Sequence, residues 1–269
     1  RIVPLGDQNN DGYDDFLTWD YRASIYIYYG GNPFDTTPGL RIDSVSNLIS
    51  AIGDINGDGD IDIADEGRNP DGWKLNVYYG GAELDSIRDL WFGLDTLFGI
   101  GFTANGGDIN CDGNIELFSW SNPQNSVLMF ELGPNPDSIP DLVLTPANIP
   151  YPDAGKSFAF GRGIMTGYFN GDNYPDLAVS LGYPGQYKIN GSIYLYWGGP
   201  SFDTIPDLII RRPGTYQDFY DLFGTVLENL GDVNGDGFDD FFAGREASAD
   251  TVSFIYFGGP DLDTIPDLI

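Results

Sequence analysis

The sequence contains no histidine and only one cysteine, and these absences exclude several kinds of site. Without histidine there is no Ser-His-Asp triad, no Cys-His pair and no histidine-ligated zinc. The single cysteine, Cys111, cannot form an intrachain disulfide, so packing or bound metal has to stabilise the fold. Most hydrolase mechanisms are therefore excluded.

Basic residues and long apolar runs are also scarce. The 269 residues include 12 Lys and Arg against 41 Asp and Glu, which gives a net charge of -29. This charge repels nucleic acid and anionic membranes, and no apolar run approaches the ~18 residues of a membrane span. No signal peptide is visible and the sequence opens at Arg1, which is typical of a mature or partial product. We expect no nucleic-acid partner and no membrane span.

The composition nevertheless favours a folded protein without helices. Hydrophobic residues make up 41% of the chain and aromatic residues 15%, which suffices for a sizeable core. No segment has convincing helical periodicity. Runs rich in Ile, Val, Tyr, Phe and Trp alternate with period two, and 37 Gly and 18 Pro interrupt them at short intervals. The pattern predicts an all-β fold.

Three sequence elements recur five times in the same order. The first is an acidic loop: GDQNNDGYDD (6 to 15), GDINGDGDID (53 to 62), GDINCDGNIE (107 to 116), GYFNGDNYPD (167 to 176) and GDVNGDGFDD (231 to 240). The second is an alternating aromatic run: SIYIYYGG, KLNVYYGG, SVLMFELG, SIYLYWGG and VSFIYFGG. The third is FDTTPGLRI, LDSIRDLWF, PDSIPDLVL, FDTIPDLII or LDTIPDLI. An ordered internal repeat of this kind indicates one structural unit used five times.

The length of the repeat indicates what the unit is. The loops start at positions 7, 54, 108, 168 and 232, so successive copies have room for a three- or four-stranded sheet. We predict an all-β β-propeller that forms a single domain over 1-269, with blades near 1-47, 48-97, 98-159, 160-222 and 223-269. A β-sandwich or a linear β-solenoid is the structural alternative.

Each acidic loop has the composition of a calcium site. Counted from its first acid, the loop offers side-chain oxygens at positions 1, 3, 5 and 9, a glycine at position 6, and the carbonyl group of position 7. Such an all-oxygen set suits Ca²⁺ better than zinc, copper or magnesium. The predicted ligand positions are Asp7, Asn9, Asp11, Tyr13, Asp15, Asp54, Asn56, Asp58, Asp60, Asp62, Asp108, Asn110, Asp112, Asn114, Glu116, Asn170, Asp172, Tyr174, Asp176, Asp232, Asn234, Asp236, Phe238 and Asp240.

The composition of the loop also fits two other structures, an EF-hand and a turn without metal. A helical EF-hand requires glutamate at position 12, where this chain has Thr18, Asp65, Ser119, Val179 and Ala243. Asp-Gly and Asn-Gly also form turns without metal, but five copies with acids in register favour metal.

The fourth loop departs from the pattern of the others. Tyr168 replaces its first acid and Asn173 its glycine. We therefore expect four strong Ca²⁺ sites and a fifth, at 168-176, that is weak or empty.

These elements resemble the FG-GAP repeats of the integrin α-subunit propeller and of bacterial surface or secreted proteins, over nearly the whole chain. The Phe-Gly element is matched at 98-99, 160-161 and 223-224, and LFGTVLENLGDVNGDGFDDFFAG (222 to 244) matches half a unit closely. The family's Gly-Ala-Pro corner is degraded, and Leu48 and Ile49 stand where Phe-Gly is expected.

The resemblance implies a propeller whose metals are structural. The integrin propeller has seven blades, so five loops imply a fragment, a smaller ring, or a ring completed by another chain. It also implies an extracellular location, either secreted or at the cell surface.

The leading functional hypothesis is a non-catalytic, calcium-stabilised propeller for adhesion, ligand recognition or surface assembly. Its expected partners are a protein or glycan ligand or copies of itself. The alternatives are a structural subunit of a fibre or surface layer, and a propeller-type polysaccharide-degrading enzyme using paired carboxylates. No acid pair outside the loops supports the enzyme.

The expected ligand surface lies opposite the loops, at the corners after the second strands. Its candidates are Trp19, Tyr21, Arg22, Arg68, Trp120, Tyr183, Tyr187 and Arg245, with Asp20, Glu66, Asn122 and Glu246 beside them. Trp19 and Trp120 could equally pack between blades. Asn190 begins a glycosylation sequon, which also arises by chance.

Overall fold

The computed structural model describes residues 2-20, 24-43, 45-69, 72-93, 100-121, 125-133, 136-146, 159-184, 191-213, 220-221, 223-244 and 253-269. These residues form β-strands joined by turns, and none of them lies in an α-helix. The chain divides into two compact units, residues 1-105 with 134-139 and residues 106-133 with 140-269. The expectation of a single domain therefore stays a prediction.

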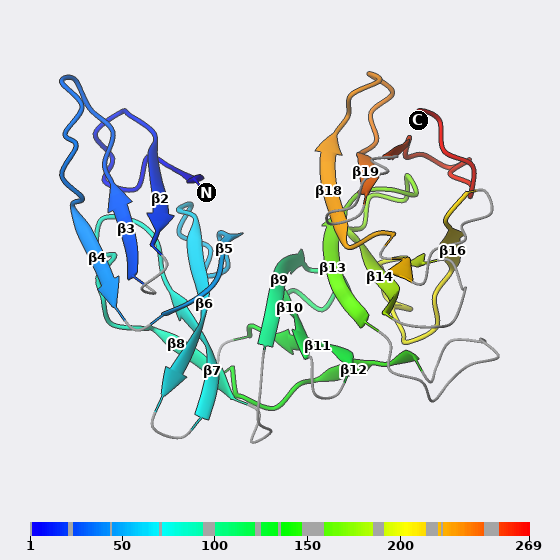
Figure 1. Cartoon of the computed structure of the whole chain (residues 1–269), viewed down its shortest axis with the longest axis horizontal. Helices are drawn as coiled ribbons and strands as arrows, with labels where there is room; N and C mark the ends of the chain where they lie inside the picture. The colour runs from blue at the N-terminus through cyan, green and yellow to red at the C-terminus, as the bar shows by residue number, and fades with distance from the viewer. Residues whose placement is uncertain are drawn as a thin grey trace. The chain divides into compact units, whose positions relative to one another are not determined.

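The first unit holds two four-stranded antiparallel sheets, drawn from blue to cyan in Figure 1. One has the order β1-β2-β3-β4, and the other the order β5-β6-β7-β8. The strands are β1 (Ile2–Gly6), β2 (Asp15–Trp19), β3 (Ser24–Tyr28), β4 (Leu40–Asp43), β5 (Val45–Gly53), β6 (Asp62–Asn69), β7 (Gly72–Tyr78) and β8 (Leu90–Gly93).

Three further sheets follow, with the orders β12-β11-β10-β9, β13-β14-β15-β16 and β18-β19-β20. The short β17 pairs with β14, and Leu268 forms a single bridge to Ile255 of β20. The strands are β9 (Ile100–Gly107), β10 (Glu116–Ser121), β11 (Ser126–Glu131), β12 (Leu142–Leu144), β13 (Ala159–Gly167), β14 (Asp176–Pro184), β15 (Ser192–Tyr196), β16 (Leu208–Arg211), β17 (Tyr220–Asp221), β18 (Val226–Gly231), β19 (Asp240–Gly244) and β20 (Phe254–Tyr256).

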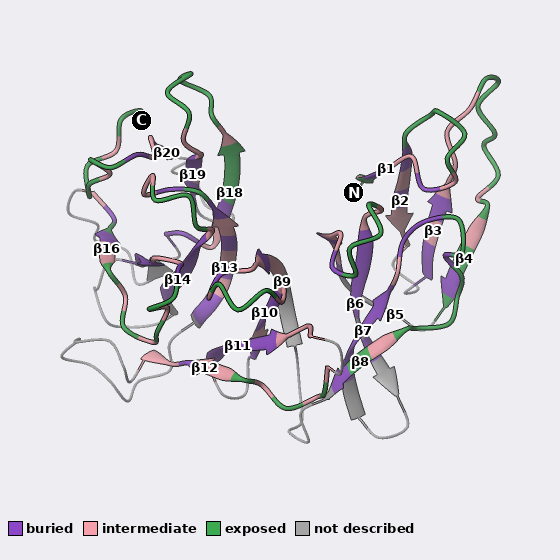
Figure 2. Cartoon of the chain, turned by 180° about the vertical axis from the view of Figure 1, so that it is seen from behind, coloured by how far each residue is buried: buried purple, intermediate pink, exposed green. Residues whose placement is uncertain are grey.

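The five sheets confirm the predicted fold class, an all-β protein built from the blades of a β-propeller. Each sheet contains one copy of the three repeated elements. The acidic loop joins the first strand to the second, and the aromatic run forms the third strand. The last element leads into the fourth strand in four sheets and into the single bridge of Leu268 in the fifth. The exposed loops and buried strand centres are visible in Figure 2.

The aspartate of the PDL element explains why the third sequence element recurs. In the fourth sheet the N–H of Asp207 donates to the carbonyl oxygen of Leu195, and the N–H of Trp197 donates to Asp207 Oδ2 at 2.8 Å. Asp89, Asp141 and Asp267 make the equivalent pair of bonds. One side chain thereby fixes the register between the third strand and the turn before the fourth.

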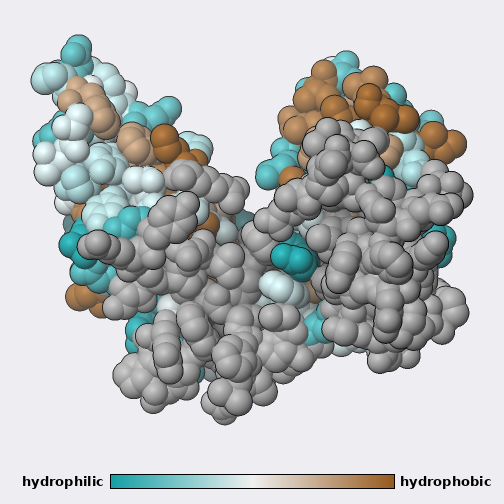
Figure 3. All heavy atoms as spheres, in the orientation of Figure 1, coloured by the Kyte–Doolittle hydropathy of each residue, from teal (hydrophilic) through white to brown (hydrophobic). Residues whose placement is uncertain are grey.

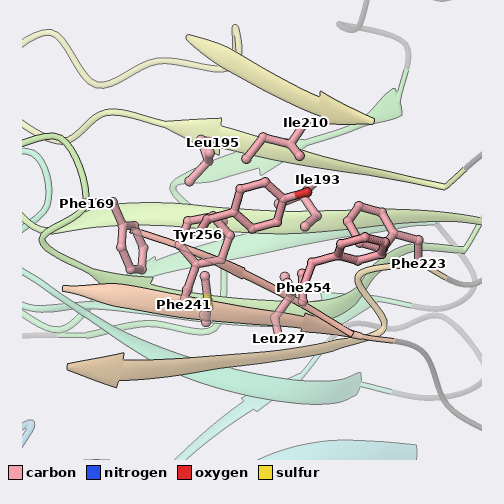
Figure 4. Close-up of a cluster of buried hydrophobic side chains, with 12 residues drawn as sticks. Phe169, Ile193, Leu195, Ile210, Phe223, Leu227, Phe241, Phe254 and Tyr256 are labelled. Carbon is pink, nitrogen blue, oxygen red and sulfur yellow. The ribbon is translucent and has the colours of Figure 1, made fainter. Parts of the chain in front are cut away.

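The apolar cores lie between neighbouring sheets. In the second unit, one cluster joins β10 and β11 to β13, β14 and β15, with Phe118 and Tyr194 among its fully buried side chains. A second apolar cluster joins the fourth and fifth sheets. In it the rings of Phe169 and Phe241 pack edge to face, with their centroids 5.3 Å apart (Figure 4). Each blade therefore depends on its neighbour to bury one face.

In the first unit, the corresponding cluster joins the first and second sheets through Leu17, Ile27 and Ile63. All three side chains are fully buried.

The Phe-Gly element has a packing role in two blades. Phe160 and Phe223 are buried in the two clusters of the second unit, and the following glycines have φ values of +87° and +82°. A Cβ atom on Gly161 would lie 2.6 Å from Val127 and 2.8 Å from the Trp120 ring. Glycine is required because the chain here crosses closely over the preceding sheet. Phe98 and Gly99 lie outside the described residues.

Asp65, in the second sheet, is a buried carboxylate that lies outside the acidic loops. Asp65 of β6 is fully buried, its Oδ1 accepts a hydrogen bond from Asn76 at 3.1 Å, and Oδ2 has no hydrogen-bond partner among the described residues. Burial raises the pKa of Asp65 to about 7, although hydrogen bonds from Asn76 and Tyr78 and the charge of Arg88 oppose this.

This raised pKa predicts a pH-dependent loss of stability. The unfolded carboxyl ionises near its ordinary pKa of 3.8, so the folded state binds the extra proton between pH 4 and 7, and stability falls as pH rises through that window. Asp65→Asn should remove the loss and stabilise the protein at pH 8 by on the order of 2 kcal/mol.

The test compares urea unfolding of wild type and Asp65→Asn between pH 4 and 8, with Asp261→Asn on an exposed turn as the control. The difference between Asp65→Asn and wild type should grow with pH. A difference independent of pH would contradict the prediction.

Candidate metal centres

All five acidic loops have the same backbone conformation. Position 4 has φ between +57° and +82°, and position 6 between +70° and +96°, in every copy. The sequence predicted the positive φ at position 6 but not the positive φ at position 4. Cys111, at position 4 of loop three, has φ +64°, in a region that favours glycine or asparagine. The residue is therefore a strained substitution in a turn whose geometry the other side chains impose.

The side chains at positions 3 and 5, and the acid at position 1 where it is present, accept hydrogen bonds from backbone N–H groups of their own loop. In loop two, Asp54 Oδ2 accepts the N–H of Gly59 at 2.8 Å, and Asn56 Oδ1 accepts the N–H of Asp58 at 2.9 Å. Asp58 Oδ1 in turn accepts the N–H of Asp60 at 2.9 Å. The bonds made by positions 3 and 5 recur in all five loops. Carboxylate and amide oxygens, the ligand types that a hard cation prefers, are thus held in fixed positions within each loop.

The closing acid at position 9 is buried and ties together three segments. Asp62 Oδ2 accepts the N–H of Ile55 at 2.7 Å, and Asp62 Oδ1 accepts the N–H of Gly80, just after the third strand, at 2.7 Å. Asp15, Asp176 and Asp240 make the same two bonds. A Cβ atom on Gly80 would lie 2.4 Å from the carbonyl oxygen of Ile61, so glycine is required there.

Burial opposes the ionisation of three closing acids, Asp62, Glu116 and Asp176. Burial raises the pKa of Asp62 and of Asp176 to about 6, although backbone N–H groups lower it. Burial and the neighbouring acids Asp112 and Asp108 raise the pKa of Glu116 to about 7, against the N–H of Ile109. A bound Ca²⁺ favours the ionised form, so metal and proton compete at these positions.

Neighbouring sheets cover the base of the loops. The N–H of Gly199 donates to the carbonyl oxygen of Ile109 at 2.7 Å, and the N–H of Gly259 donates to that of Phe169 at 2.7 Å. In the first unit the N–H of Gly81 instead donates to the Gln8 side chain. In these three blades the second glycine of the pair therefore connects the blade to the loop of the preceding blade.

Position 2 of loop five differs from its counterparts. Val233 is 55% exposed, whereas Ile109 and Phe169 are fully buried. Exposed Leu230 lies nearby in sequence, and Figure 3 shows apolar side chains gathered where β18 ends.

Loop four keeps the shape of the others without its first acid. Asn170 and Asp172 make the usual bonds, and Asn173 adopts φ +70° in place of glycine. Tyr168 is 51% exposed, and its N–H donates to Asp239 of the next sheet at 3.0 Å. This loop offers two carboxylates at its ligand positions where the others offer three.

An acid from β11, Glu131, lies beside loop three and was not predicted from the sequence. One carboxylate oxygen from each of Asp112, Glu116 and Glu131 lies within 4.8 Å of the other two. Glu131 ends β11, 15 residues after the loop closes, at the position that holds Tyr29, Tyr79, Trp197 or Phe257 in the other repeats. Only the alignment of the five aromatic runs could have indicated it.

The structure places two of the predicted ligand-surface residues within the protein's packing. Trp19 of β2 packs against the core of the first unit. Trp120 of β10 lies against Gly161, and its indole Nε1 is buried without a hydrogen-bond partner among the described residues. Both environments favour the packing role.

The other surface candidates remain predictions. Tyr21, Arg22, Tyr187, Arg245 and Asn190 lie outside the described residues. Arg68 and Tyr183 lie in β6 and β14, but their side chains are outside the described part.

Comparison with known proteins finds integrin α subunits. The chain is 32% identical to mouse integrin alpha-7 over 124 residues, 33% identical to human integrin alpha-7 over 103, and 32% identical to Drosophila melanogaster integrin alpha-PS3 over 111. These matches cover 45%, 37% and 39% of this chain but only 9%, 8% and 9% of the relatives. No family model matches the sequence.

Nothing in the described part of the chain is a helix of the length and apolarity needed to cross a bilayer. The similarity to these relatives covers less than half of this chain, whose structure has five antiparallel sheets with acidic loops of shared backbone conformation. The chain is a β-propeller with FG-GAP-like repeats, and it is similar to integrin α subunits over part of its length.

Proposed function

We propose that this protein is a non-catalytic, extracellular, calcium-stabilised β-propeller that serves in adhesion, ligand recognition or surface assembly. The observation that carries the proposal is the shared geometry of the loops: the side-chain oxygens at positions 3 and 5 make the same hydrogen bonds in five copies, and the closing carboxylate is buried in each. Similarity to integrin α subunits supports a recognition role rather than catalysis.

The calcium would act by holding each hairpin closed. An ion at the loop centre neutralises acids at positions 1, 5 and 9, which otherwise repel one another within a chain of net charge -29. Because the loop joins the first two strands and its closing acid reaches the third, stabilising the loop stabilises most of a blade. Saturated oxygen sites of this kind leave little room for substrate, which supports a structural role.

Acid chemistry outside the loops gives the enzyme hypothesis little support. Among the described residues, Asp112, Glu116 and Glu131 form the one cluster of three acids close enough to hold a metal ion together. This cluster lies at loop three. Asp65 is buried within a sheet rather than in a substrate site.

Calcium stabilisation is tested with a matched pair of variants. Asp236 in loop five and Asp172 in loop four both occupy position 5 and make the same bond to the N–H of position 7. In saturating Ca²⁺, Asp236→Asn should lower Tm by about 2 to 4 °C more than Asp172→Asn does, equivalent to about 1 kcal/mol. Loop four lacks its first acid, so little bound calcium is lost there.

The control is the same comparison in EGTA, where the two variants should be equally stable. Wild-type Tm should also fall on chelation. Equal decreases in Tm for the two variants in Ca²⁺, or a wild-type Tm unaffected by EGTA, would contradict calcium stabilisation.

The recognition surface is tested on glycan and peptide arrays in Ca²⁺. Arg22→Ala and Arg245→Ala, at two predicted corners, should each weaken binding about tenfold if they contact the ligand. Arg41→Ala is the control, because Arg41 is an exposed residue of β4 that pairs with Asp43 at 2.7 Å. If both corner variants bind as wild type does, the ligand surface does not include these corners. Calcium-dependent self-association in size-exclusion chromatography, without array binding, would favour the structural subunit.

A further inference from the structure

Loop three differs from the other loops in its surroundings. Glu131 comes from β11, outside the loop, and its Oε1 accepts a hydrogen bond from the side chain of Asn114 at 2.6 Å. A carboxylate oxygen of Glu131 also lies within 4.8 Å of one from Asp112. Two carboxyl groups this close repel each other unless a proton or a cation lies between them.

The closing acid of loop three points independently to a cation. Glu116 is fully buried and its Oε2 accepts the N–H of Ile109 at 2.8 Å, but its Oε1 has no hydrogen-bond partner among the described residues. A buried carboxylate oxygen without a partner is costly, and a metal ion is one way to satisfy it.

The reason for this unpaired oxygen lies in the glycine pair. Leu132 replaces the first glycine, and its N–H donates to the carbonyl oxygen of Ile115 at 2.7 Å instead of to the closing acid. In loop two the equivalent N–H, from Gly80, satisfies Asp62 Oδ1. Glutamate at position 9 is one methylene longer than aspartate, so the released oxygen extends further toward the acids of the loop.

We propose that Glu131 is an additional metal ligand supplied by β11, and that loop three is a four-carboxylate site that binds hard cations more tightly than the other loops. Carboxylate oxygens of Asp112, Glu116 and Glu131 lie within 4.8 Å of one another. Asp108, which accepts the N–H groups of Asp112 and Gly113, would supply the fourth carboxylate, whereas loops one, two and five have three at their ligand positions. Calcium affinity rises with the number of charged ligands and with the rigidity of the site. Asn114 and the strand ladder of β11 hold Glu131 in place. The inference rests on the proposed calcium binding.

The test is a competitive chelator titration of Ca²⁺ binding to the full chain. Glu131→Gln should weaken the tightest binding step about tenfold, and Asp108→Asn should weaken the same step. Glu83→Gln, which removes one charge from an exposed turn, is the control and should leave the step unchanged. Glutamine keeps an oxygen that can accept the bond from Asn114, so the substitution tests the charge rather than the packing.

A second measurement separates metal binding from a structural role. In EGTA, Glu131→Gln should unfold at the same Tm as wild type or a higher one, because a repulsive charge has been removed, while in Ca²⁺ its Tm should be lower. A decrease of similar size in both conditions would assign Glu131 a structural role and overturn the proposal. A tightest step unaffected by Glu131→Gln would also overturn it.

The two proposals can fail separately. If Asp236→Asn weakens calcium binding but Glu131→Gln does not, calcium stabilisation stands and the special role of loop three is lost. If the wild-type chain binds no calcium, both are overturned.

Discussion

The buried carboxylate that closes each acidic loop is the interaction on which the blade depends. In four blades it accepts one N–H from the start of the loop and another from the glycine just after the third strand, so that one side chain joins the hairpin turn, the second strand and the third. A charged group buried in this way has to be satisfied by hydrogen bonds, a proton or a cation. This requirement links loop sequence, glycine placement and metal binding.

The other repeated features follow from this constraint. The first glycine of the pair has to bring its N–H to the closing acid, and Gly198 approaches the carbonyl oxygen of Pro175 too closely for any side chain. The second glycine contacts the loop of the preceding blade, and the apolar clusters fill the space between adjacent sheets. Loop and core are therefore parts of one packing arrangement, in which calcium would relieve the charge that the arrangement buries.

Much of this arrangement could be predicted from the sequence because it is repeated and local. The five acidic loops, aromatic runs and PDL elements stand in a constant order, and the short spacing within a loop allows Asp62 or Asp240 to accept the N–H of position 2. The position of Glu131 could not be predicted in this way, because its approach to Asp112 depends on pairing between β10 and β11. The positive φ of Cys111 and the packing of Trp120 against Gly161 likewise depend on the folded backbone.

The central claim is that these loops are calcium sites differing in strength according to their carboxylates. Native mass spectrometry of the full chain, across a series of free Ca²⁺ concentrations, tests it most directly by counting bound ions. The account predicts four ions retained at low free calcium, and a fifth only at much higher concentration because Tyr168 replaces an acid in loop four. A chain that retains no calcium, or one that fills five sites together, would contradict it.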